Sequence, residues 1–63
     1  MNADGEQAVR HVLRGLRFPA ERWQVITQAE LYGADGHTRS LLHALPRRRY
    51  RSTSDVAAAM DAG

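Results

Sequence analysis

Residues 35–46 read DGHTRSLLHALP and carry the clearest local signals in the chain. Asp35 is a residue type that starts helices, because its carboxylate accepts hydrogen bonds from the N–H groups that a first turn leaves free. Three leucines then recur at the spacing of one helix face: Leu41, Leu42 and Leu45. Pro46 cannot continue a helix, since it has no N–H group and its ring clashes with the preceding turn. The stretch predicts a short helix at about 36–45 whose leucine face needs partners.

Segments on either side of this stretch show the same helical periodicity. Helices are expected there at about 5–15, 19–32 and 53–61. Asp4 with Gln7, and Ser52 with Asp55, have the spacing of capping boxes at the starts of the first and last helices. Gly33 suits the left-handed position that closes the second helix. Since no segment alternates apolar and polar residues as a strand would, the predicted fold is all-α, a compact bundle of four short helices.

Apolar side chains on one face of each helix form the predicted core. They are Val9, Val12, Leu13, Leu16, Phe18, Val25, Ile26, Ala29, Leu41, Leu42, Leu45, Tyr50, Val56 and Met60. Sixty-three residues allow a single domain, 1–63, whose ends at 1–4 and 62–63 are expected to be flexible. A domain this small buries only about 60% of the surface of its unfolded chain. A monomer is feasible, and a homodimer would add burial at the exposed margin near Trp23 or Leu31.

The composition excludes several classes of protein. The chain has no cysteine, which excludes disulfide scaffolds and cysteine-based zinc sites. No uncharged stretch approaches the ~20 apolar residues of a membrane span. The polar, acidic start of the chain lacks the basic and apolar regions of a signal peptide. We therefore expect a cytoplasmic protein with no membrane partner.

Positive charge is concentrated in one part of the chain. All nine basic residues are arginine and face seven acids, for a net charge of +2. Residues 36–54 hold five arginines and no acid: Arg39, Arg47, Arg48, Arg49 and Arg51. Such a cluster is typical of phosphate or carboxylate binding. A solvated surface segment, or the codon bias of a GC-rich genome, would produce the same pattern.

Three short blocks of sequence, taken together and in their order along the chain, form a recognisable pattern. They are the run Leu13 to Ala20, then Val25, Ile26, Ala29, Gly33 and Ala34, then the run Leu45 to Ser52 followed by Asp55 and Val56. In this combination they resemble a family of small prokaryotic domains, the domain-of-unknown-function family 2795. The resemblance covers about residues 9–60 and implies a compact helical domain, sometimes in tandem copies, with no established activity. It supplies no catalytic or binding residues to carry over.

The chain departs from the family's pattern at two positions. Arg47 stands where the family usually has an acid, and Thr53 stands where it usually has proline. A partner interaction built on the basic segment would therefore belong to this protein and not to the family as a whole.

The second and third helices have some features of a helix-turn-helix motif. Ala29 and Gly33 have the spacing of its small residue and turn glycine, and Leu42 falls at an expected apolar position. Gln28 and Arg39, however, occupy positions where apolar residues usually pack. On the simpler interpretation, Ala29 is a core contact and Gly33 is a helix stop.

If the motif is real, the third helix would enter the major groove of DNA with His37, Thr38 and Arg39 at its start. The arginines that follow would hold phosphates, which makes binding strongly salt-dependent. They are Arg47, Arg48, Arg49 and Arg51.

The same arginines also suit an acidic protein surface, because the guanidinium fork binds carboxylate and phosphate alike. Trp23 with Arg22 is a candidate anchor for such a surface, since tryptophan and arginine are enriched at interface hot spots. Alternatively, Trp23 only covers the margin of the core.

The histidines and the serine nearest to them indicate neither a metal site nor a catalytic site. His11, His37 and His43 fit no common metal-ligand spacing, and Ser40 with His43 lacks the third group and oxyanion site that nucleophilic catalysis needs. We therefore expect no enzyme activity, no catalytic residue, no metal and no cofactor. The predicted function is a small non-enzymatic binding or adaptor module that contacts an acidic partner through the basic segment 39–51. The alternative is a DNA-binding protein, so the expected partner is an acidic protein surface or nucleic acid.

Overall fold

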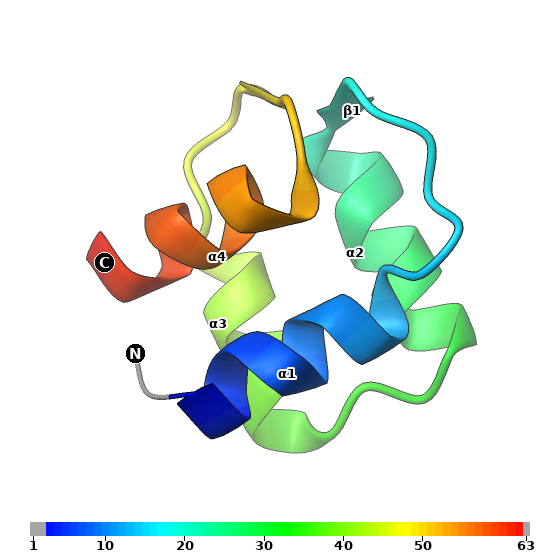
Figure 1. The fold of residues 1–63 in the computed structure, drawn as a ribbon, viewed down its shortest axis with the longest axis vertical. Coiled ribbons are helices and arrows are strands. Elements are labelled where there is room, and N and C mark those ends of the chain that lie inside the picture. Colours follow the sequence, from blue (N-terminus) through cyan, green and yellow to red (C-terminus); the bar gives the residue numbers. More distant parts are fainter. Residues whose placement is uncertain (1–2, 63) are drawn as a thin grey trace.

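Helices dominate the computed structural model, which describes residues 3–62 and the side chains of residues 7–60. The helices are α1 (Ala3–Val12), α2 (Arg22–Leu31), α3 (Gly36–His43) and α4 (Thr53–Ala62). Helix α1 contacts each of the other three, and the core lies between them (Figure 1). The prediction of four short helices is confirmed.

A short strand pair joins two distant parts of the chain. The strands are β1 (Ala20–Glu21) and β2 (Arg49–Tyr50). They run antiparallel, with Ala20 opposite Tyr50 and Glu21 opposite Arg49. The prediction of a purely all-α fold is therefore wrong. Two residues are too few to show the alternation by which a strand is read from sequence, and the pairing depends on tertiary contact.

The first three helices are each shorter than predicted at one end. Helix α1 ends at Val12 and not near residue 15, and the chain then turns through Gly15, whose φ of +85° lies in the left-handed region. Helix α2 begins at Arg22 and not near residue 19, because residues 20–21 form β1. The segment between α1 and α2 is therefore longer and more extended than the periodicity predicts.

Helix α3 ends at His43 and not near residue 45. The N–H group of Ala44 is shared between the carbonyls of Ser40 and Leu41, at 3.2 Å each. This sharing tightens the last turn and ends the helix two residues early.

The predicted signals between α2 and α3 are confirmed. Gly33 has a φ of +79° and closes α2, where the Ala34 N–H donates to the Ala29 carbonyl at 3.0 Å. Asp35 caps α3, because its Oδ1 accepts a hydrogen bond from the Thr38 N–H at 2.7 Å. This bond holds the pKa of the Asp35 carboxyl below its usual value.

The capping box at α4 is confirmed in one half, since the Asp55 N–H donates to the Ser52 Oγ at 3.1 Å. The box predicted from Asp4 and Gln7 cannot be compared in the same way, because the Asp4 side chain lies outside the described residues. The flexibility expected at the two chain ends stays a prediction.

The buried core draws on every helix and both strands. Its members are Val9, Val12, Leu13, Ala20, Val25, Ala29, Leu42, Leu45, Tyr50, Val56, Ala57 and Met60. Four residues predicted to be in the core are only partly buried and pack against its edge: Leu16, Phe18, Ile26 and Leu41. The prediction omits Ala57 on α4 and Ala20, which is buried because it lies opposite Tyr50 in the strand pair. Within residues 3–62, no helix has the length and apolar character that crossing a membrane requires.

Candidate functional site

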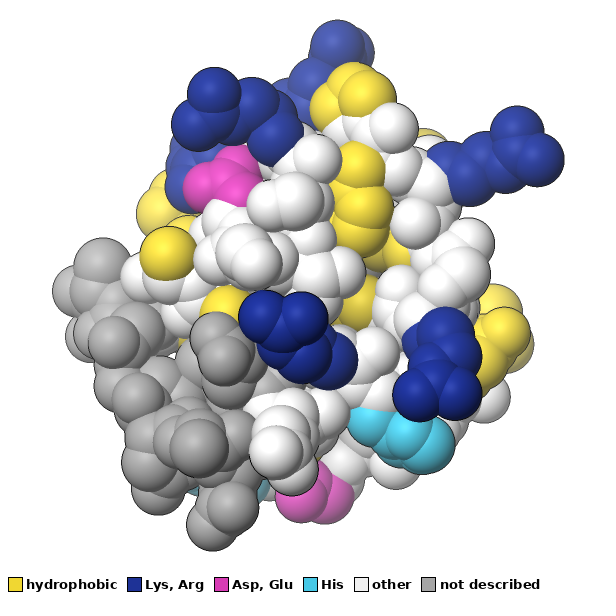
Figure 2. All heavy atoms as spheres, in the orientation of Figure 1, with side chains coloured by type: hydrophobic (Ala, Val, Ile, Leu, Met, Phe, Trp, Pro, Cys, Tyr) yellow, Lys and Arg dark blue, Asp and Glu magenta, His cyan; other side chains and the backbone are white. Residues whose placement is uncertain are grey.

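The arginine side chains do not form one continuous patch on the face seen in Figure 2, where they are spread over the surface. All five arginines of the segment 36–54 are exposed: Arg39, Arg47, Arg48, Arg49 and Arg51. They differ in what each side chain contacts, and these contacts determine which of them a partner can use.

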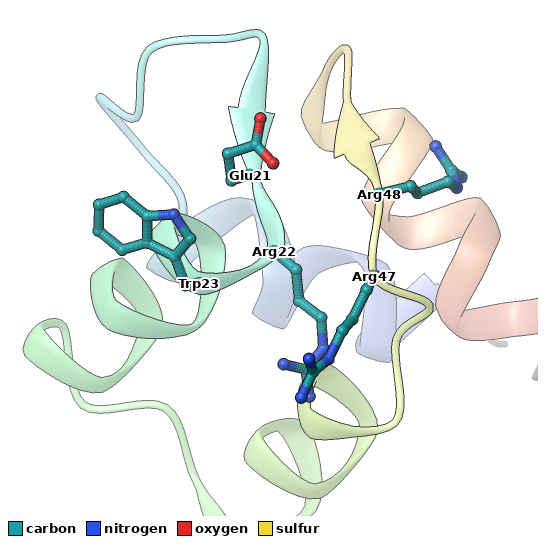
Figure 3. A pocket seen from close by; sticks show the side chains of 5 residues that line it. All are labelled: Glu21, Arg22, Trp23, Arg47 and Arg48. Carbon is teal, nitrogen blue, oxygen red and sulfur yellow. The ribbon is translucent and has the colours of Figure 1, made fainter.

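An open pocket of about 380 Å³ lies where the start of α2 meets the segment before β2 (Figure 3). The residues that line it are Glu21, Arg22, Trp23, Arg47 and Arg48. The strand pair holds the two walls together, because Glu21 ends β1 and Arg49 begins β2. The structure thus brings together two candidates that the sequence analysis treats separately, the Trp23–Arg22 anchor and the arginine run.

Arg49 is tied to the opposite strand and does not line the pocket. Its Nε donates to Glu21 Oε2 at 3.1 Å, between residues that face each other in the strand pair. Exposed pairs of this kind add little stability, so the contact mainly fixes where Arg49 lies. Its positive charge is already matched by a carboxylate.

Arg48 is held against α4. Its Nη1 and Nη2 donate to the two carboxylate oxygens of Asp55 at 3.2 Å each, and its guanidinium carbon lies 4.2 Å from the centre of the Tyr50 ring. Asp55 also accepts a hydrogen bond from the Arg51 N–H at 3.0 Å. The bonds from Arg48 and Arg51 hold the pKa of Asp55 below its usual value, and the bond to Asp55 raises the pKa of Arg48. In Figure 3, accordingly, Arg48 points away from Arg47.

Arg22 caps the end of α3 from another part of the chain. Its Nε donates to the Leu45 carbonyl at 3.0 Å, and its Nη2 donates to the His43 carbonyl at 2.6 Å. The negative end of the helix dipole favours a cation at this place. Arg22 therefore stabilises the fold as well as lining the pocket.

Arg47 and Trp23 are the lining residues that remain open to a partner. Within the described part of the chain, the Arg47 side chain has neither an ion pair nor a hydrogen bond. Trp23 is 64% exposed, so it covers little of the core. In Figure 3, Arg22 and Arg47 extend toward the same end of α3, and Trp23 lies on the α2 side.

The remaining candidates lie away from the pocket. Arg39 on α3 and Arg51 after β2 are exposed, but neither lines it. Thr38 is only 5% exposed, so the start of α3 cannot present it to a DNA groove, whereas His37 and Arg39 remain exposed. Leu42 is buried, as the helix-turn-helix comparison expects. DNA binding itself stays a prediction.

Guanidinium and indole groups dominate the chemistry of this pocket. Across the side chains that the structure describes, no group of three or more histidine, cysteine, aspartate or glutamate residues could hold a metal ion. His43 Nε2 lies 3.4 Å from Glu30 Oε2, and both of these side chains are about half exposed.

The pocket can bind a carboxylate or phosphate on Arg47 and an apolar group on Trp23.

Comparison with known proteins places the chain in a family. The model of a family described as protein of unknown function (DUF2795) matches residues 5–57. The chain belongs to this family. The DUF2795 match runs from α1 into α4 and includes all five residues of the pocket, and it confirms the resemblance seen in the sequence. No curated protein and no solved structure gives a significant match.

Two contacts near the pocket are not anticipated by the sequence analysis. Glu21 carries no local signal for its pairing with Arg49, because the two residues are 28 positions apart. Asp55 was interpreted only as a capping residue, yet its carboxylate binds Arg48 and the Arg51 N–H. Its position four residues after Arg51 was the one signal in the sequence that could have suggested the second contact.

Proposed function

We propose that the protein is a small cytoplasmic binding module without enzyme activity, and that it contacts an acidic protein through the pocket beside Trp23 and Arg47. The observation that carries the proposal is the pocket itself, which places an exposed indole and an unpaired guanidinium on facing segments. Tryptophan and arginine are the residue types that most often dominate binding energy at protein interfaces.

An acidic protein fits the contacts better than DNA does. Arg48 and Arg49 already bind the carboxylates of Asp55 and Glu21, so they offer less charge to a phosphate backbone. The arginines on the face in Figure 2 are spread out, whereas a DNA footprint is usually a continuous basic surface. DNA binding remains the alternative function, and the experiment below distinguishes the two.

The test is a titration of the intact chain with acidic, neutral and basic peptides of equal length, and with duplex DNA, at two salt concentrations. Trp23 is the single tryptophan of the chain and lines the pocket, so its fluorescence reports binding directly. We expect a saturable change with the acidic peptides. Arg47→Ala should weaken their binding by about tenfold or more, the usual cost of losing a charged hydrogen-bond donor.

Arg17→Ala is the matched control, because it removes the same charge from an exposed arginine that does not line the pocket. It should leave the affinity within about twofold, a difference well below 1 kcal/mol. Equal losses in the Arg17 and Arg47 variants would contradict the proposal, since they would indicate general attraction by net charge. Tight, steeply salt-dependent binding of DNA, with none of peptides, would favour the alternative function.

A further inference from the structure

We infer that the pocket recognises one carboxylate next to one large apolar side chain, as in an acidic residue beside a leucine in the partner chain. This inference rests on the proposed function and names the feature that the pocket selects. It differs from recognition of an acidic run, in which affinity would grow with the number of negative charges.

The first argument concerns which arginine side chains in and beside the pocket still have free N–H donors. Two nitrogens of Arg22 donate to backbone carbonyls, and both terminal nitrogens of Arg48 donate to Asp55. Arg49 outside the pocket is paired with Glu21. Arg47 is thus the lining arginine whose fork is open in the described part of the chain, and one fork binds one carboxylate in a bidentate manner.

The second argument is the apolar wall that Trp23 forms on the α2 side of the pocket (Figure 3). Trp23 exposes 64% of its surface, and an indole in this position gains most when an apolar group covers it. A volume of about 380 Å³ is near the lower end for ligand pockets, which span roughly 300–1,000 Å³. A pocket of this volume has room for about two side chains.

The third argument is the carboxylate that the pocket already contains. Glu21 lines the same pocket as Arg47, and its carboxylate is already paired with Arg49, so this wall offers no unmatched positive charge to a second acid. Because a second acidic residue in the ligand would find no unpaired cation on this wall, it adds less than an apolar residue that covers Trp23. The arrangement therefore selects against acidic runs.

The experiment compares four blocked peptides that share a glycine–serine background and differ at two adjacent positions: Glu–Leu, Glu–Gly, Gln–Leu and Glu–Glu. Binding to the intact chain is measured by Trp23 fluorescence and by calorimetry. We expect Glu–Leu to bind most tightly, and Glu–Gly and Gln–Leu each to bind about tenfold more weakly. Glu–Glu should bind no more tightly than Glu–Gly.

Variants then assign each peptide position to a pocket residue. In Arg47→Ala, Glu–Leu and Gln–Leu should bind equally, because the carboxylate has lost its partner. In Trp23→Ala, followed by calorimetry, Glu–Leu and Glu–Gly should bind equally. Arg17→Ala should preserve the order of the four peptides. Both pocket side chains are exposed, and circular dichroism checks that the variants are folded.

The outcomes separate this inference from the proposed function. If Glu–Glu binds more tightly than Glu–Leu and the binding needs Arg47, the inference is overturned while the acidic partner stands. If Arg47→Ala weakens Glu–Leu and Gln–Leu by the same factor, the carboxylate does not bind Arg47, and the inference is again overturned. If none of the acidic peptides binds, both proposals fail.

Discussion

Asp55 binds Arg48 through both of its carboxylate oxygens, at 3.2 Å each, and so fastens the arginine segment to the first turn of α4. A third bond, from the Arg51 N–H at 3.0 Å, anchors the backbone of the same segment. The run Arg47–Arg49 is therefore an ordered part of the fold, and two of its three guanidinium groups are already paired with carboxylates.

The Asp55 contacts predict a pH dependence of stability. Because the pKa of Asp55 is lowered in the folded state, its contribution is present above its unfolded value of 3.8 and is lost as the pH falls through the lower folded value. The wild type should therefore lose stability below about pH 4, and Asp55→Asn should lose less over this window. Thermal unfolding followed by circular dichroism from pH 2 to 7 measures the difference.

Asp35 provides the control for that measurement. Its pKa is also lowered, chiefly by the Thr38 N–H bond, so Asp55→Asn should keep part of the acid dependence. The Asp35→Asn, Asp55→Asn double variant should show the flattest profile. Parallel profiles for the wild type and Asp55→Asn would contradict the linkage.

Tyr50 should contribute to stability in two separable ways. Its hydroxyl donates to the Pro46 carbonyl at 2.6 Å, so Tyr50→Phe should cost about 1 kcal/mol of unfolding free energy. Tyr50→Ala should cost about 3–5 kcal/mol, because the ring is completely buried. Urea unfolding monitored at the helix band of the circular dichroism spectrum tests both values. Equal losses in the two variants would show that the ring packing contributes nothing.

Gly33 and Gly36 offer a matched pair for backbone conformation. A Cβ added at either glycine would meet no neighbouring atom within 4 Å, so steric clashes cannot explain a difference in stability between the two alanine variants. Gly33 has a φ of +79°, and Gly33→Ala should cost about 1–2 kcal/mol through strain alone. Gly36 begins α3 without a left-handed φ, and Gly36→Ala should be neutral or stabilising by up to about 1 kcal/mol. Denaturant unfolding gives both numbers, and a stabilised Gly33→Ala would refute the role of the turn.

Arg22 should not be replaceable by lysine. The Arg22 Nε and Nη2 donate to two different carbonyls, those of Leu45 and His43, which a single ammonium group cannot match from the same place. We expect Arg22→Lys to lose about 1 kcal/mol of unfolding free energy and Arg22→Ala somewhat more. Full stability in the lysine variant would mean that charge at the end of α3, and not the fork, is what matters.

The helices could be predicted because their signals are local. The signals for the cap at Asp35, the turn at Gly33 and the buried face at Leu42 each lie within a few residues, and the structure confirms them. Helix ends were less predictable. Residues 20–21 pair with β2 in place of extending α2, and nothing within the second helix signals this competition.

The pocket was predictable in its parts but not in its assembly. The sequence shows Trp23, Arg22 and the arginine run as candidates, because tryptophan and arginine are common at interfaces and arginine binds carboxylates and phosphates. Their meeting depends on the register of β1 against β2, which is set by packing around Tyr50 and Ala20. The roles of individual arginines depend on acids such as Asp55 as well, so a count of charges could not distinguish Arg47 from its neighbours.

The two-residue strand pair also makes the proposed binding surface discontinuous in sequence. A synthetic peptide copying residues 46–52 would carry the arginines without the Trp23 wall, and we expect it to be a poor competitor. Since the surface exists only in the native state, every ligand that occupies it must raise the melting temperature. A ligand at a hundred times its Kd adds about 2.7 kcal/mol, which in a chain this short is a shift of roughly 10 °C or more. Thermal-shift screening is therefore a sensitive test for the proposed ligands of this small domain.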